Sequence, residues 1–186
     1  MAHISKNNPF YFITCVTHKR LPVFRTDKLK SILANAFDEA RRSAGFSIFA
    51  YVIMPEHFHI VTDSHRTMSE TIRFLNGISA RRVINYLKEN GLTESLNKLR
   101  IMDRGSNYKY SLWEHHSNSF SISSEAVLRQ KVHYIHCNPV EEGLVGLPED
   151  YLYSSVRFWH KRVIEDEPLM VDIRNDRLES MKPTEA

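Results

Sequence analysis

The chain has 186 residues, of which 42% are hydrophobic and 25% charged, with six glycines and two cysteines. This composition is typical of one globular domain, so it excludes a fibrous repeat, a disordered chain and a disulfide framework. The net charge is +3, but residues 1–133 hold 19 Lys and Arg against 11 Asp and Glu, and residues 134–186 hold 6 against 11. The excess of positive charge in residues 1–133 suits a polyanionic partner such as nucleic acid, although the same charges can simply keep a protein in solution.

Short β-rich runs alternate with longer helical periodicities over the first 90 residues. Aromatic and β-branched residues concentrate in three runs that predict strands, at residues 10–17, 46–54 and 57–62. Apolar residues recur at three- and four-residue spacing over residues 29–44 and 69–90, which predicts two amphipathic helices. Thr26 or Asp27 can cap the first helix, and Gly45 can end it. The second and third strands are so close in sequence that they should form an antiparallel hairpin.

The second half of the chain is less regular. We expect a short strand near Ser111–Trp113 and a third helix that begins after Ser123 or Ser124. Pro139 should set the limit of that helix, because the residue before a proline avoids the helical region. The order of elements predicts an α+β fold, a ferredoxin-like sandwich with helices on one face of an antiparallel sheet. It would occupy residues 1–163, followed by an acidic C-terminal tail over residues 164–186 that is either free or packed on the body.

Targeting and membrane segments are not visible in the sequence. Residues 1–9 lack the basic start and apolar run of a secretory signal, and no stretch approaches the roughly 18 apolar residues of a membrane span. Cys15 and Cys137 form neither a CxxC pair nor a zinc-finger spacing, which suits a reducing compartment. We therefore expect a soluble, cytoplasmic protein that has no membrane partner.

Two clusters carry chemical groups. The first is His57-Phe58-His59, where strand alternation points both imidazoles to one face, with Cα atoms about 7 Å apart, close enough to share a metal ion. Taken alone, such a pair also fits a structural or solvent-facing role. The second lies on the third helix, where Tyr134 is directed away from the apolar stripe and Asn138 falls on the same face one turn later. Taken alone, Tyr134 also fits a surface tyrosine and Asn138 a helix end.

Together these blocks resemble the single-tyrosine HUH transposases and, within them, the REP-associated tyrosine transposases of bacteria. By that resemblance His57 and His59 bind the metal, Tyr134 is the nucleophile and Asn138 is the third ligand. Glu56 stands where the family usually carries Asn, and it either binds the metal or serves as a turn residue. The matching blocks follow the family's order from residue 10 to about residue 159: Met54-Pro55-Glu56-His57-Phe58-His59, Leu112-Trp113-Glu114, Tyr134-Ile135-His136-Cys137-Asn138-Pro139-Val140, Gly143-Leu144-Val145 and Tyr153-Ser154-Ser155.

The resemblance implies cleavage and rejoining of DNA strands. Attack by the Tyr134 hydroxyl would leave a 5′-phosphotyrosine and a free 3′-hydroxyl, which preserves the bond energy for rejoining. A tyrosine hydroxyl has a pKa of about 10 and is mostly protonated at neutral pH, so a divalent cation, Mg or Mn, is needed to neutralise the phosphate. No nucleotide cofactor is required, in agreement with the lack of a GxxxxGK[ST] sequence.

The implied partner is single-stranded or hairpin DNA, because the family recognises imperfect hairpins that have unpaired bases beside them. Basic residues after the first strand and on the second helix are candidates for backbone contacts, although each also fits a solvated face. DNA as the substrate places the protein with the bacterial nucleoid. Relatives act as homodimers or as monomers, so a homodimer remains possible. The candidate contacts are Lys19, Arg20, Arg81, Arg82 and Lys88.

Two other functions use the same residues. One is a catalytically silent protein that binds hairpin DNA, and the other is a metal-dependent phosphodiesterase that activates water. Covalent attachment of DNA to the protein distinguishes the transferase from both.

Overall fold

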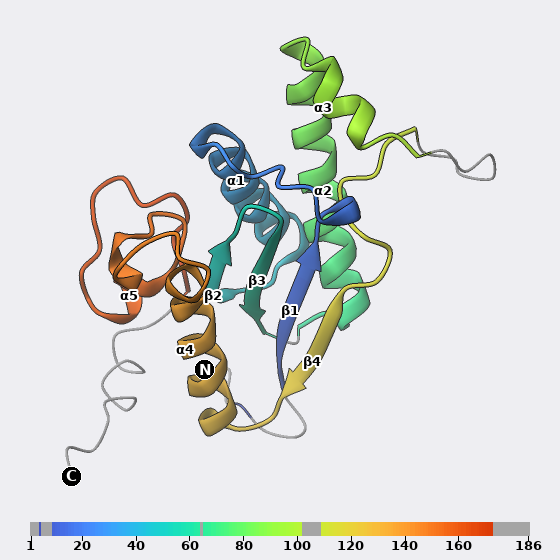
Figure 1. Ribbon diagram of the computed structural model, residues 1–186. Helices are drawn as coiled ribbons and strands as arrows, with labels where there is room; N and C mark the ends of the chain where they lie inside the picture. The colour runs from blue at the N-terminus through green and yellow to red at the C-terminus, as the bar shows by residue number, and fades with distance from the viewer. Residues whose placement is uncertain (1–3, 5–8, 64, 102–108, 173–186) are drawn as a thin grey trace.

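A four-stranded antiparallel sheet forms the centre of the computed structural model, which describes residues 4, 9–63, 65–101 and 109–172 (Figure 1). The strand order is β2-β3-β1-β4. With a helix between β1 and β2 and another between β3 and β4, this order is ferredoxin-like, so the predicted fold class is confirmed. The strands are β1 (Phe10–Val16), β2 (Ile48–Ile53), β3 (His57–Thr62) and β4 (Asn118–Ile122).

Helices α1 (Asp27–Ala44) and α2 (Met68–Glu89) lie together behind the sheet (Figure 1). The Thr26 side chain caps α1, and Gly45 ends it in the left-handed conformation that suits glycine, with φ of 70°. Thr67 and Glu70 form a reciprocal capping box at the start of α2. Both predicted helices are therefore confirmed to within two residues at each end.

The layer between α1, α2 and the sheet holds the aromatic core. The ring of Phe58 on β3 meets Phe37 of α1 edge-on, with centroids 4.7 Å apart, and meets Trp113 at 5.0 Å. Trp113 donates its indole N–H to the hydroxyl of Ser79 on α2 at 2.9 Å. Because side chains alternate along a strand, packing Phe58 into this core turns His57 and His59 to the opposite face of the sheet.

Helix α4 (Glu125–Glu141) covers that opposite face (Figure 1). The sequence predicts helices on one face of the sheet, and α1 and α2 form that layer. Helix α4 adds a second layer on the other face, so every residue of β2 and β3 is buried. The prediction that Pro139 limits the helix is wrong by two residues. Proline removes one backbone donor, but the helix continues because Glu142 N–H still bonds to the Asn138 carbonyl at 3.0 Å.

The strand expected near Ser111–Trp113 is only a single bridge between Trp113 and Thr17. The fourth strand of the sheet is instead β4, which pairs with β1 and places Phe120 opposite Phe12. The sequence of β4, NSFSI, is mostly polar because β4 lies at the edge of the sheet and is largely exposed. Phe120 and Ile122 alternate with serines, but two apolar residues make too short a pattern to predict a strand.

The chain after α4 closes the other edge of the sheet. Ser154 forms a bridge with Val52 of β2, and the remaining short elements here are η2 (Pro148–Asp150) and α5 (Val156–Trp159). Part of the expected tail packs on the body: Leu169 is buried, and the Asp172 carboxylate accepts from Ile48 N–H at 2.8 Å and pairs with Arg41 at 2.8 Å. Residues 173–186 lie outside the described residues.

Two further short elements precede the site. A 3-10 turn, η1 (His18–Arg20), follows β1, and a short helix, α3 (Thr93–Lys98), extends beyond the end of α2. Of the helices in the described part of the chain, none is long and apolar enough to cross a membrane.

Candidate active site

Two histidines on β3 form the floor of the site. The ring centroids of His57 and His59 are 4.7 Å apart, and the side chains are almost fully buried beneath α4. Strand alternation places both rings on one face, as the sequence predicts. The helix above contributes Asn138, whose Oδ1 lies 3.2 Å from His57 Nε2. The structure therefore brings together the three residues expected to bind a metal.

The ring of His57 lies between the side chains of Glu56 and Asn138. His57 Nδ1 lies 2.9 Å from the Oε1 atom of Glu56, and a carboxylate can only accept there, so Nδ1 carries a proton. A neutral His57 then presents an unprotonated Nε2 to the Oδ1 of Asn138, which is also an acceptor. Two acceptors that face each other suit a shared cation. Without a cation, the contact needs a second proton on the ring or a rotated amide.

His59 also has a nitrogen available for a ligand. Its Nδ1 bonds to the Thr14 hydroxyl at 2.7 Å, whereas its Nε2 is buried and has no hydrogen-bond partner among the described residues. Burial, followed by the neighbouring charges of His57 and Lys131, lowers the pKa of His59 to about 3. The ring is therefore neutral at neutral pH, as a metal-binding imidazole must be.

These donors fit a divalent cation that is intermediate between hard and soft. Two imidazole nitrogens and one amide oxygen suit Mn, and they suit Mg when phosphate oxygens complete the shell. Within the described ranges, no group of three or more His, Cys, Asp or Glu side chains is arranged to hold a metal. The third donor here is an asparagine amide, which lies outside that set of residue types.

Tyr134 stands on α4 one turn before Asn138. Its ring centroid lies 5.2 Å from that of His59, and its side chain is 38% exposed. Ile135 and Val132 on the same helix are buried, so Tyr134 lies off the core-facing stripe, as the sequence predicts. His136, which the sequence places away from the ligands, bonds instead to the Ser155 hydroxyl at 2.9 Å.

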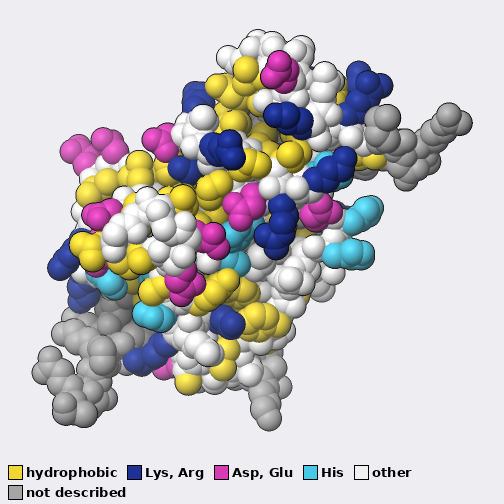
Figure 2. Space-filling model, in the orientation of Figure 1, with side chains coloured by type: hydrophobic (Ala, Val, Ile, Leu, Met, Phe, Trp, Pro, Cys, Tyr) yellow, Lys and Arg dark blue, Asp and Glu magenta, His cyan; other side chains and the backbone are white. Residues whose placement is uncertain are grey.

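A groove of about 420 Å³ opens between the sheet and α4 at these residues. Figure 2 shows histidine side chains near the centre of this face, beside both acidic and basic side chains. The nucleophile candidate and the metal-ligand candidates therefore share one solvent-accessible space. Its lining residues are Phe12, Thr14, Val16, Arg20, Glu56, His57, His59, Asn118, Lys131, Tyr134, Asn138 and Glu142.

The basic residues predicted to contact DNA divide into two groups. Arg20 lines the groove, and Lys19 precedes it in η1, where the Lys19 N–H donates to the Glu114 carboxylate. Arg81 and Arg82 lie on α2 behind the sheet, where both pair with Glu39 of α1, at 3.3 and 2.7 Å. Lys88, near the end of α2, lies 5.6 Å from the Tyr110 ring centroid. The structure does not bring the three α2 residues to the groove.

Six residues that line the groove were not predicted from the sequence: Phe12, Thr14, Val16, Asn118, Lys131 and Glu142. Lys131 lies on α4 one turn before Tyr134, and this shared face could have indicated it. Thr14 reaches His59 only through the pairing of β1 with β3, which no local pattern reveals. Phe120, which stacks on Phe12 beside the groove, lies on β4, a strand that the sequence does not predict.

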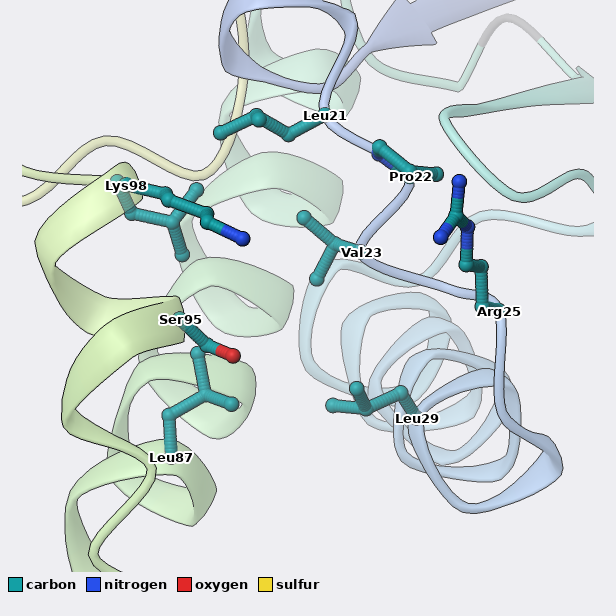
Figure 3. A pocket seen from close by; sticks show the side chains of 9 residues that line it. Leu21, Pro22, Val23, Arg25, Leu29, Leu87, Ser95 and Lys98 are labelled. Atoms are coloured by element: carbon teal, nitrogen blue, oxygen red, sulfur yellow. The ribbon is translucent and has the colours of Figure 1, made fainter.

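A second, apolar cavity of about 170 Å³ lies between the starts of α1 and α3 and the end of α2. Figure 3 shows Val23, Leu29 and Leu87 pointing into it, with Ser95 at its side. It shares no lining residue with the groove. The cavity has none of the histidine or tyrosine groups of the groove.

A ferredoxin-like sheet whose two strand-borne histidines face a tyrosine on a covering helix defines the class expected from the sequence, a single-tyrosine HUH transposase. The chain belongs to the IS200-like transposase family, because the family described as "Transposase IS200 like" matches residues 5–138. That match covers most of the chain and includes both histidines, Tyr134 and Asn138.

Two relatives agree with this assignment. A REP-associated tyrosine transposase of Haemophilus influenzae is 26% identical over 149 residues, which is 78% of each chain. A solved REP-associated tyrosine transposase, bound to a REP hairpin, has a TM-score of 0.60 and 19% identity over 94% of this chain and 92% of its own. The first likeness places the chain near the REP-associated group, and the second shows the shared fold.

Proposed function

We propose that this transposase cleaves and rejoins single-stranded DNA beside hairpins, through a 5′-phosphotyrosine at Tyr134. The observation that carries the proposal is the groove itself, in which Tyr134 lies beside three metal-type donors. The tyrosine ring is 5.2 Å from the ring of His59. Tyr134 is exposed, whereas His57 and His59 are buried, so the candidate nucleophile is open to a substrate.

His57, His59 and Asn138 would hold the divalent cation, either Mg or Mn. When bound, the cation supplies positive charge that neutralises the phosphate and favours the charge that develops during attack. Glu56 holds the His57 ring so that Nε2 faces the groove, and Thr14 does the same for His59. These contacts fix both rings before DNA arrives.

The covalent step exchanges one phosphodiester for another. The Tyr134 oxygen loses its proton and bonds to phosphorus, while the bond from phosphorus to the 3′-oxygen breaks and that oxygen gains a proton. A 3′-hydroxyl from another strand then attacks the phosphotyrosine and releases Tyr134 unchanged. Arg20 and Lys131 line the groove and offer positive charge to the DNA backbone.

Hairpin DNA is the proposed substrate because the solved relative was bound to a REP hairpin. The basic charge of residues 1–133 supports a polyanionic partner. This substrate would place the protein at the nucleoid. A homodimer remains a prediction from the family.

Covalent capture tests the proposal. Wild-type protein incubated with Mn or Mg and labelled hairpins, taken from repeats of the genome that encodes it, should give a protein–DNA adduct that survives denaturation. Tyr134→Phe should give no adduct, because its ring lacks the attacking oxygen. Tyr11→Phe is the matched control: Tyr11 lies on β1 next to Phe12 and therefore points to the other face of the sheet, so the adduct should persist.

Other outcomes would replace the proposal. An adduct with Tyr134→Phe would mean that another residue is the nucleophile. Cleaved DNA that never carries protein would indicate a metal-dependent phosphodiesterase. Hairpin binding that is equal in wild type and His57→Ala, independent of metal and without cleavage, would indicate a silent binding protein.

A further inference from the structure

An aromatic cluster with a lysine above it lies at the edge of the groove beside Tyr134. Phe12 of β1 and Phe120 of β4 stack with centroids 5.1 Å apart and planes inclined by 24°. The Lys131 ammonium lies 5.4 Å from the centroid of Phe12, 5.0 Å from that of Phe120 and 5.7 Å from that of Tyr134. Three rings from three elements therefore surround one cation at the edge of the site.

Phe120 is unusually accessible for its residue type. It is 38% exposed, whereas Phe12 beneath it is 5% exposed. Among the exposed large hydrophobic side chains of the described residues, the aromatic ones are Phe120 and Tyr134, and Lys131 lies over both. An exposed aromatic ring on a strand, close to the candidate nucleophile, suits a flat ligand that stacks on it.

Lys131 favours an anionic part of the same ligand. Across the described ranges, no carboxylate lies within ion-pair distance of its ammonium group, which is held over the rings instead. A cation over an exposed aromatic face is held only weakly. The ammonium group can therefore leave the rings for a phosphate at little cost.

We propose that Phe12, Phe120 and Lys131 form a subsite for one unpaired nucleotide of single-stranded DNA. The base stacks on Phe120, which Phe12 supports from below, and Lys131 binds the adjoining phosphate beside Tyr134. Stacking on an aromatic side chain tolerates any base but needs a base whose face is free. A base stacked within a duplex cannot enter, so the subsite selects unpaired DNA next to the nucleophile. The inference rests on the proposed function for its substrate class.

Binding measured without cleavage tests this subsite. Fluorescence anisotropy in EDTA would compare a labelled thymidine decamer with an abasic decamer of the same length and charge. Wild type should bind the thymidine decamer more tightly. Phe120→Leu keeps an apolar side chain but removes the ring, so affinity for the thymidine decamer should fall roughly 5- to 100-fold while affinity for the abasic decamer stays the same.

The lysine is tested by the salt dependence of the same assay. Lys131→Met keeps the alkyl stem, so affinity for both decamers should fall, and the slope of log affinity against log salt should decrease by about one. Lys28→Met is the matched control, because Lys28 also lies over a ring, 5.9 Å from the Tyr86 centroid, in the layer behind the sheet. That variant should bind both decamers as wild type does.

Crosslinking locates the contact. A decamer that carries one 5-iododeoxyuridine should crosslink under light to the peptide that contains Phe120 in wild type and not in Phe120→Leu. Equal binding of the thymidine decamer by wild type and Phe120→Leu would overturn the subsite, as would an unchanged salt slope in Lys131→Met. If Phe120→Leu weakens binding of the thymidine decamer but the wild-type protein forms no covalent adduct, the subsite stands and the proposed covalent chemistry is rejected. If the wild-type protein forms the adduct but Phe120→Leu does not change binding, the covalent chemistry stands and the subsite is rejected.

Discussion

Glu56 immediately precedes His57 and accepts a hydrogen bond from its ring at 2.9 Å. A carboxylate in this position fixes the tautomer of a metal-binding histidine and makes its other nitrogen a stronger donor. The sequence left two roles open for Glu56, as a ligand or as a turn residue. Its contact with Nδ1 of His57 supports a third role, in which Glu56 orients a ligand and does not itself bind the metal.

Replacing Glu56 should therefore weaken metal binding. We expect Glu56→Ala to lower Mn affinity by about 10- to 100-fold, as removal of such a partner does elsewhere. Glu56→Gln keeps an oxygen that can accept from Nδ1, so its loss should be smaller. Isothermal titration of the DNA-free protein with Mn measures both effects. Glu142→Ala is the control, because Glu142 lines the same groove. Equal losses in Glu142→Ala and Glu56→Ala would mean that net charge, not the contact with His57, sets the affinity.

The residues that the sequence identifies are those whose geometry is local. Alternation on one strand puts His57 and His59 on one face, and a separation of four on one helix does the same for Tyr134 and Asn138. Thr14 could not be predicted in this way, because it meets His59 only after β1 and β3 have paired. The proximity of the two local pairs came from the family resemblance and not from either pattern.

At the scale of elements, the sequence predicts the helices best where capping residues mark their ends. Thr26 and Gly45 bound α1 as expected. Pro139 gave the wrong limit for α4, because the rule for the residue before a proline is a preference that tertiary packing overrides. Asn138 and Pro139 are both buried against the body, so packing keeps this last turn helical.

The segment after α4 is held by a buried ion pair. Arg157 donates to both carboxylate oxygens of Glu167 at 2.7 Å, and it also donates to the carbonyls of Glu149, Tyr151 and Leu152. Both side chains are almost fully buried. The ion pair therefore connects residues 149–152, which precede the bridge to β2, with the acidic tail that follows α5.

Breaking this pair should destabilise the fold. We expect Arg157→Met to lower the free energy of unfolding by about 3–5 kcal/mol, because it leaves the Glu167 carboxylate buried and unpaired. Urea unfolding followed by circular dichroism measures the change. The double variant Arg157→Met with Glu167→Met removes both charges and should recover part of the loss. A double variant that is no more stable than Arg157→Met would mean that the bonds from Arg157 to the backbone carbonyls carry the effect.

At the scale of the whole molecule, the sheet separates two basic surfaces. Arg20 and Lys131 line the groove on the α4 side. Arg81 and Arg82 lie behind the sheet and share the carboxylate of Glu39, so these three side chains together carry a single net positive charge. A count of charges along the sequence cannot separate the two surfaces, because the separation arises only when the sheet forms.

The salt dependence of hairpin binding should distinguish these surfaces. Each phosphate neutralised by the protein contributes about one unit to the slope of log affinity against log salt. We expect Arg20→Ala to lower that slope by about one. The double variant Arg81→Ala with Arg82→Ala should lower it by less than one, because Glu39 already compensates half of that charge and neither side chain lines the groove. A decrease of about two in the double variant would mean that the hairpin also contacts α2. The DNA contacts that the sequence predicts for Arg81 and Arg82 would then be correct, in addition to those in the groove.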